Sequence, residues 1–120
     1  MRAFGIMGLV AALTLAAAVV VPGDRAAADE QADIELLVRS AKTPADHERI
    51  AAYYDREAVI ARAQAEKHRR MSEDYKKAGG PAAKTHLHEH CDALVKTYQS
   101  AAKDYESMAK AHREMAKAAK

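Results

Sequence analysis

The sequence has no tryptophan, one phenylalanine and one cysteine among its 120 residues. The phenylalanine, Phe4, lies in an N-terminal apolar segment, so tyrosine supplies every aromatic side chain after it. A chain with so few large apolar side chains builds a thin core and commonly needs a metal, a disulfide or a partner subunit. The single cysteine, Cys91, cannot form an internal disulfide. It is therefore an intermolecular disulfide partner, a free thiol or a metal ligand.

An excess of charge of one sign is also missing, because the formal net charge is only +2. Such a balance argues against a nucleic-acid-binding surface and against attraction to anionic membranes. The motifs of common active sites are missing too: there is no Cys-x-x-Cys pair, no Gly-rich phosphate loop and no nucleophile elbow. We therefore predict that the protein is not an enzyme.

The N-terminus has the pattern of a secretory signal peptide. Arg2 precedes an apolar run over residues 6–21, and the small residues 26–28 suit a signal peptidase. The apolar run is short and polar sequence follows it, which favours cleavage over the alternative of an uncleaved membrane anchor. We expect residues 1–28 to be the signal peptide and residues 29–120 to be one periplasmic or secreted domain without a stable membrane anchor.

The composition after Thr43 predicts an all-α fold, because Ala, Lys, Glu, Arg and Met are strong helix formers. A helix start is predicted at Thr43, which is followed by Pro44 and Asp46. The paired glycines at 79–80 end the helix. We predict a short helix at about 32–41 and long helices at about 44–77 and 81–119. The long helices would fold back on each other as an antiparallel helical hairpin.

Both long helices carry residues at alternating steps of three and four, which predicts a coiled-coil seam. The second helix has Leu87, Cys91, Leu94, Tyr98, Ala101, Tyr105, Met108, His112, Met115 and Ala119. The first has His47, Ile50, Tyr54, Glu57, Ala61, Gln64, His68, Met71 and Tyr75. A shift of 44 residues lays one helix on the other, most specifically at the two His-Arg-x-Met segments. Aliphatic residues off the seam predict a second buried face, covered by the short helix or by a partner in a homodimeric four-helix bundle.

The fold-back places histidine opposite histidine or cysteine at each end of the hairpin, with methionine one turn beyond. Imidazole and soft sulfur together suit copper or zinc. The predicted ligands are His47, His68, Met71, His86, His88, His90, Cys91 and His112. His86 and His90 would share a helix face at the spacing that lets two imidazoles bind one ion. The alternatives are solvated residues at the helix start, polar seam residues that fix the register and methionines that only pack.

Two segments carry a resemblance. Residues 43–54, which read Thr-Pro-Ala-Asp-His-Glu-Arg-Ile-Ala-Ala-Tyr-Tyr, and residues 90–94, which read His-Cys-Asp-Ala-Leu, resemble segments of small exported bacterial proteins of unassigned function. This resemblance implies a helical hairpin and no activity. In general character the chain is also similar to small periplasmic metal-binding helical bundles, with far fewer histidines than the His-rich members.

The sequence thus predicts two functions. The first is binding of a soft or borderline transition metal through the histidine, cysteine and methionine positions of the seam. The second is a non-catalytic structural or protein-interaction role in the cell envelope, in which the helical bundle contacts another envelope protein. The off-seam aliphatic residues Val59, Ile60 and Val95 favour the second function.

Overall fold

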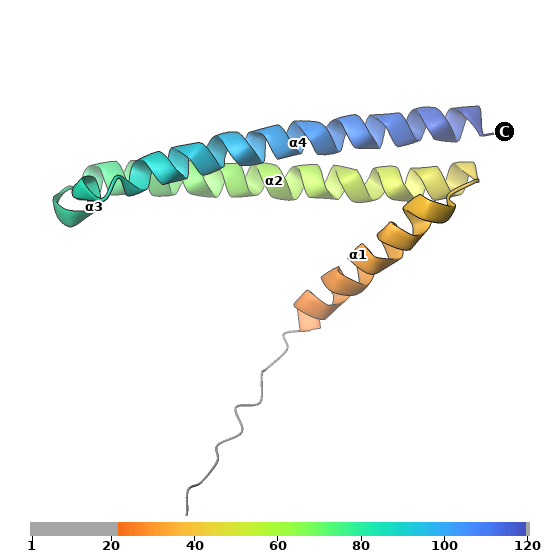
Figure 1. The fold of residues 1–120 in the computed structure, drawn as a ribbon, viewed down its shortest axis with the longest axis horizontal. Helices are drawn as coiled ribbons and strands as arrows, with labels where there is room; N and C mark the ends of the chain where they lie inside the picture. Colours follow the sequence, from red (N-terminus) through yellow and green to blue (C-terminus); the bar gives the residue numbers. More distant parts are fainter. Residues whose placement is uncertain (1–21, 120) are drawn as a thin grey trace, which may run out of the picture.

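The computed structural model describes residues 22–119, with the side chains of residues 26–119, and these residues form four helices (Figure 1). They are α1 (Pro22–Ser40), α2 (Pro44–Ala78), α3 (Gly80–Lys84) and α4 (Leu87–Ala118). No strand occurs in this part of the chain. The prediction of an all-helical chain in which two long helices pack together is confirmed. The apolar run of the predicted signal peptide lies outside the described residues.

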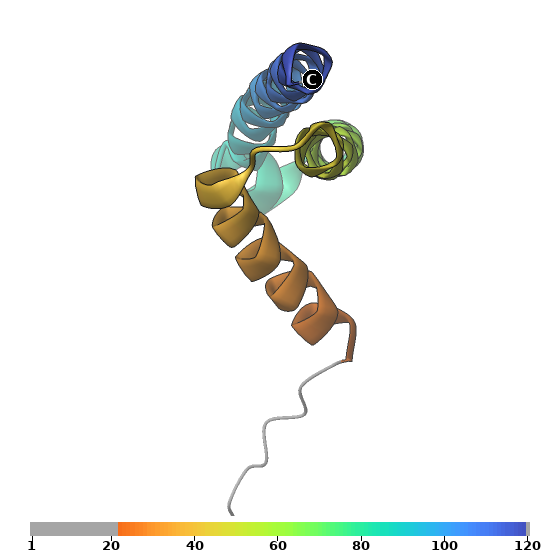
Figure 2. The ribbon, with the colours of Figure 1, turned by 90° about the vertical axis from the view of Figure 1, so that its right-hand side faces the viewer.

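The helices α2 and α4 lie side by side and run in opposite directions, whereas α1 diverges from them (Figures 1 and 2). The helix α1 is attached to α2 by few groups. Tyr53 donates a hydrogen bond to Gln31, and Arg56 forms an ion pair with Glu30. Ile34 of α1 is buried beside them. The attachment therefore rests on one apolar side chain and two polar links.

The helix α2 begins where its sequence predicts. The Thr43 side chain accepts a hydrogen bond from the backbone N–H of Asp46 at 3.1 Å, and the Asp46 carboxylate accepts one from the backbone N–H of Thr43 at 3.0 Å. This reciprocal capping box satisfies N–H groups that lack a partner inside the helix. Bonds from Thr43 and Lys42 lower the pKa of Asp46. The helix ends at Gly79, whose φ of 61° lies in the left-handed region that favours glycine.

The prediction of one continuous helix over 81–119 is wrong. A short helix, α3, ends at Lys84, and His86 has a left-handed backbone with φ of 55° before α4 begins. The hydroxyl of Thr85 donates to the carbonyl oxygens of Pro81 and Ala82, at 3.2 and 3.0 Å. Such side-chain bonds to the preceding turn compete with helix propagation. The first helix, α1, is also longer than the predicted 32–41, because the alanine-rich segment before it is helical.

On α4 the buried seam follows the predicted spacing at every second position and lies one residue further along at the others. On α2 all nine predicted residues are at least partly buried, and at every second position the next residue is buried too. Among the buried and partly buried residues, those of α2 that follow steps of three and four are Ala51, Tyr54, Ala58, Ala61, Ala65, His68 and Ser72. Those of α4 are Cys91, Val95, Tyr98, Ala102, Tyr105, Ala109, His112 and Ala116. Small residues thus replace the predicted Leu94, Met108 and Met115, which are exposed. Layers of alanine let the two helices approach closely, while tyrosine and histidine fill the layers between.

Candidate functional site

The predicted ligands near the turn do not gather around a common point. His86 precedes α4 and is not part of it, so its predicted position on one helix face with His90 is wrong. The imidazole of His86 lies 3.0 Å from the carboxylate of Glu89, and His90 is exposed. Among the described residues, no three His, Cys, Asp or Glu side chains come together as a metal-binding group. Metal binding at this end of the hairpin stays a prediction.

His68 and Cys91 are both on the seam, where the fold-back predicts them, yet no hydrogen bond joins them. His68 stacks on Tyr98, with ring centroids 5.6 Å apart and planes only 8° apart. Its Nδ1 atom is buried and has no hydrogen-bond partner, and the same is true of Nδ1 of His88. Cys91 is buried as a free cysteine. Met71 is only partly buried beside this group.

At the other end of the helix pair, His47 and His112 do meet. Their Nδ1 atoms are 3.1 Å apart, and their rings have centroids 5.4 Å apart with an angle of 34° between the planes. Tyr54 stacks on His112 at a centroid distance of 5.9 Å. Burial, together with the neighbouring His47, lowers the pKa of His112. Two imidazoles from different helices therefore face each other through their nitrogen atoms.

The two ends of the seam are related by the internal repeat. The shift that carries Tyr54 onto Tyr98 also carries His68 onto His112. In the structure Tyr54 stacks on His112, and Tyr98 stacks on His68. Equivalent pairs thus make equivalent contacts, which supports the repeat seen in the sequence. The ends differ because the position equivalent to His47 is Cys91.

We expect acid to destabilise the fold through His112. Its pKa is lower in the folded chain than the ordinary histidine value of 6.5, so the unfolded chain binds more protons in this range. The free energy of unfolding should therefore fall as the pH drops through about 6.5. Urea unfolding at a series of pH values measures this slope. A His112→Gln variant should have a flatter curve there, and an unchanged slope would show that His112 does not cause it.

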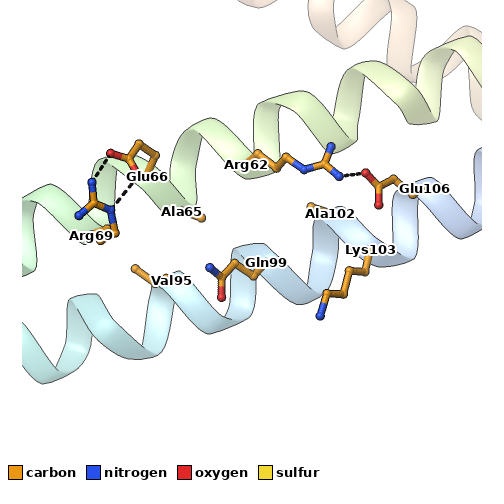
Figure 3. Close-up of a pocket in the computed structure, with 9 residues that line it drawn as sticks. All are labelled: Arg62, Ala65, Glu66, Arg69, Val95, Gln99, Ala102, Lys103 and Glu106. Atoms are coloured by element: carbon orange, nitrogen blue, oxygen red, sulfur yellow. Dashed lines mark hydrogen bonds and ion pairs between the residues drawn. The ribbon is translucent and has the colours of Figure 1, made fainter.

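On one side of the seam, charged residues of α2 pair with oppositely charged residues of α4. Successive pairs are seven or fourteen residues apart along each helix. This charged row consists of the pairs Asp55–Arg113, Arg62–Glu106 and Lys76–Asp92. Figure 3 shows a hollow that is lined by the Arg62–Glu106 pair and by Arg69, which is paired with Glu66 of its own helix.

The pKa values of the row's aspartates are lowered. The causes are the Arg113 side chain for Asp55, and hydrogen bonds from Ser72 and Lys76 for Asp92. The arginines that line the hollow already hold carboxylates, so it offers no strong site for an anion.

The other side of the seam carries an apolar row along α4. Its members, at steps of seven residues, are Leu87, Leu94, Ala101, Met108 and Met115. The four large members are between 37% and 43% exposed. Ile60 of α2, which is 52% exposed, lies beside Ala101 in a hollow between the two helices. Sequence reasoning placed most of this row inside the two-helix seam and therefore missed it as a surface.

Comparison of the chain with protein-family models, with curated proteins and with solved structures finds no match in any of the three. None of the described helices is both long enough and apolar enough to cross a membrane. The candidate features are therefore the apolar row and the contact between His47 and His112, both of which follow from this chain's own geometry.

Proposed function

We propose that the protein is an exported, non-catalytic helical protein whose hairpin pairs with a second copy to form a four-helix bundle of the cell envelope. The apolar row of α4 carries this proposal. Its four large side chains are exposed although they repeat with the heptad period that a packed helix requires. The sequence pattern of the first 28 residues supports export.

The apolar stripe on α4 is wide enough to suggest that two further helices pack against the helix pair. A two-helix coiled coil needs two apolar positions per heptad, whereas a helix of a four-helix bundle carries three. The seam of α4 supplies two positions in each heptad, such as Tyr98 and Ala102. Ala101, Met108 and the rest of the apolar row supply the third. The helix pair therefore presents one apolar position per heptad more than its own packing uses.

The order of sizes along the row favours a second copy of this chain. Two leucines lie on one side of the small Ala101, and two methionines lie on the other. If α4 packs against α4 of a second copy in the opposite direction, Leu94 meets Met108 and Leu87 meets Met115. A surface that matches itself in this way is what a two-fold symmetric interface needs.

The helix pair has a small core, so assembly with a second copy would add to its stability. Ile34 and Ile50 are the only large aliphatic side chains that are buried among the described residues. The other buried residues are mostly alanines, each of which removes little apolar surface from water. Pairing would cover Leu94, Met108 and Met115 and so add to the buried apolar area of each chain. The assembly would thus supply part of the stability that a thin core lacks.

Measuring the mass of the exported protein over a range of concentrations tests the proposal. Sedimentation equilibrium should show a dimer, and the Leu94→Glu variant should dimerise at least about tenfold more weakly because it places a charge in the apolar row. Ser100→Glu is the matched control, because Ser100 lies on the same helix at an exposed position away from the seam. A wild-type protein that stays monomeric at high concentration, or equal effects of both variants, would contradict the proposal.

Metal binding, the other function that the sequence predicts, is supported in the structure by the contact between His47 and His112. This contact lies at the open end of the helix pair and does not depend on assembly.

A further inference from the structure

The separation of the His47 and His112 nitrogens matches the geometry of one bound metal ion. Zinc lies about 2.0–2.1 Å from imidazole nitrogen, so two such nitrogens at tetrahedral corners are about 3.3 Å apart. The two Nδ1 atoms are 3.1 Å apart in this structure. A shift of a few tenths of an ångström, together with a rotation of the rings that directs both Nδ1 lone pairs at one point, converts the contact into half of a tetrahedral coordination shell.

We propose that His47 and His112 bind one divalent transition-metal ion of the zinc class through their Nδ1 atoms. The ion joins the first turns of α2 to the last turns of α4, and water completes its coordination. Without the ion, the same two atoms share a proton in an N–H···N hydrogen bond. When the ion binds, that proton moves to Nε2 of the same ring through solvent, so both neutral imidazoles present a lone pair and no proton is lost overall.

The surroundings of the two rings favour this role. Metal ions bind neutral imidazole, so a ligand histidine must be deprotonated at the working pH. Stacking on Tyr54 and partial burial in the seam fix the orientation of the His112 ring. Both histidines remain partly exposed, which leaves the remaining coordination positions open to solvent.

The two ends of the seam differ in the contact between their candidate ligands. Under the internal repeat, Cys91 and His68 correspond to His47 and His112. No hydrogen bond joins Cys91 to His68, and Nδ1 of His68 has no partner. Of these two pairs, only His47 and His112 thus have an observed contact between their donor atoms. The ion should bind at the His47 end.

An ion at this position would close the open end of the helix pair. His47 lies near the start of α2 and His112 near the end of α4, whereas the turn already joins their other ends. A link between the open ends stabilises the folded chain, because the ion binds only when both helices are in place. Added zinc should therefore raise the melting temperature as well as bind.

Calorimetric titration of the purified exported protein with zinc chloride tests the proposal. We expect one ion per chain, with affinity at least about tenfold weaker in the His47→Ala and His112→Ala variants. A variant with both His86→Ala and His90→Ala removes two exposed histidines and should bind zinc as the wild type does. Wild-type binding no tighter than that of the His47→Ala variant would overturn the proposal. Loss of binding in the control alone would overturn it too, because the ion would then sit at the turn.

Two further measurements keep the result independent of folding and of assembly. Imidazole NMR signals of His47 and His112 should shift together on addition of zinc to the wild-type protein, a readout that needs no substitution. Shifts confined to His86 and His90 would overturn the proposal. The Leu94→Glu variant should bind zinc as tightly as the wild type, so failure of the assembly and failure of the metal site are distinguishable.

Discussion

Replacing Ile50 by alanine is expected to lower the free energy of unfolding by about 2–4 kcal/mol. Ile50 has no exposed surface and is one of the two largest fully buried side chains among the described residues. Shortening this side chain to a methyl group leaves a cavity in a core whose other buried residues are mostly alanines. Urea unfolding, followed by the loss of the helical circular dichroism signal, measures the change.

The control for this prediction is Leu36→Ala. Leu36 lies on α1 with 63% of its surface exposed, so the substitution removes a similar side chain that is already in water. We expect its effect on the free energy of unfolding to stay within about 0.5 kcal/mol. Equal losses in the two variants would show that Ile50 is not part of the stabilising core.

Enlarging an alanine of the seam should destabilise the chain by overpacking. Ala109 is 1% exposed and lies in one of the layers that let α2 and α4 approach closely. A leucine there forces the helices apart or leaves its own rotamer strained, which costs about 1–3 kcal/mol. The measurement is again urea unfolding, at a protein concentration low enough that assembly does not contribute.

The matched variant is Ala111→Leu, two residues along the same helix. Ala111 is exposed, so leucine can point into solvent and keeps nearly the same helix propensity. Its free energy of unfolding should change by less than about 0.5 kcal/mol. A stabilised Ala109→Leu variant would contradict the alanine seam and support one that uses the larger side chains, Met108 and Met115.

The sequence predicts the helices well because their signals are local. The hydroxyl of Thr43 and the carboxylate of Asp46 form the start of α2 within one turn, and Gly79 ends it by its own backbone freedom. The break at Thr85 and His86 was missed, because alanine and leucine around it read as continuous helix. The left-handed backbone at His86 marks the break, and the hydroxyl bonds of Thr85 to the preceding turn accompany it.

On α4 the spacing predicts only every second position of the seam, for a different reason. The spacing identifies the tyrosine and histidine layers, such as Tyr105 and His112, but two neighbouring residues compete for each layer between them. Choosing the larger side chain selects Met108, whereas the structure buries Ala109. Hydrophobic periodicity ranks residues by the area they can bury, and it carries no information on how closely two helices can approach.

The candidate site was also predicted only in part. The fold-back register brought His47 opposite His112 from the sequence alone, since it depends only on the position of the turn. The failure of His86 and His90 to share a helix face follows from the left-handed backbone at His86. Whether two facing side chains touch depends on distances of a few tenths of an ångström, which periodicity does not specify.

The charged row decides how the two helices align along their length. A seam made largely of alanine looks nearly the same after sliding by one heptad, so apolar packing hardly distinguishes one alignment from the next. In the observed alignment every pair of the row is attractive. Sliding one way brings Asp55 against Glu106, and sliding the other way brings Arg62 against Arg113. Exposed ion pairs contribute little to stability one by one. Their order along the helices therefore favours the observed alignment over these slipped ones.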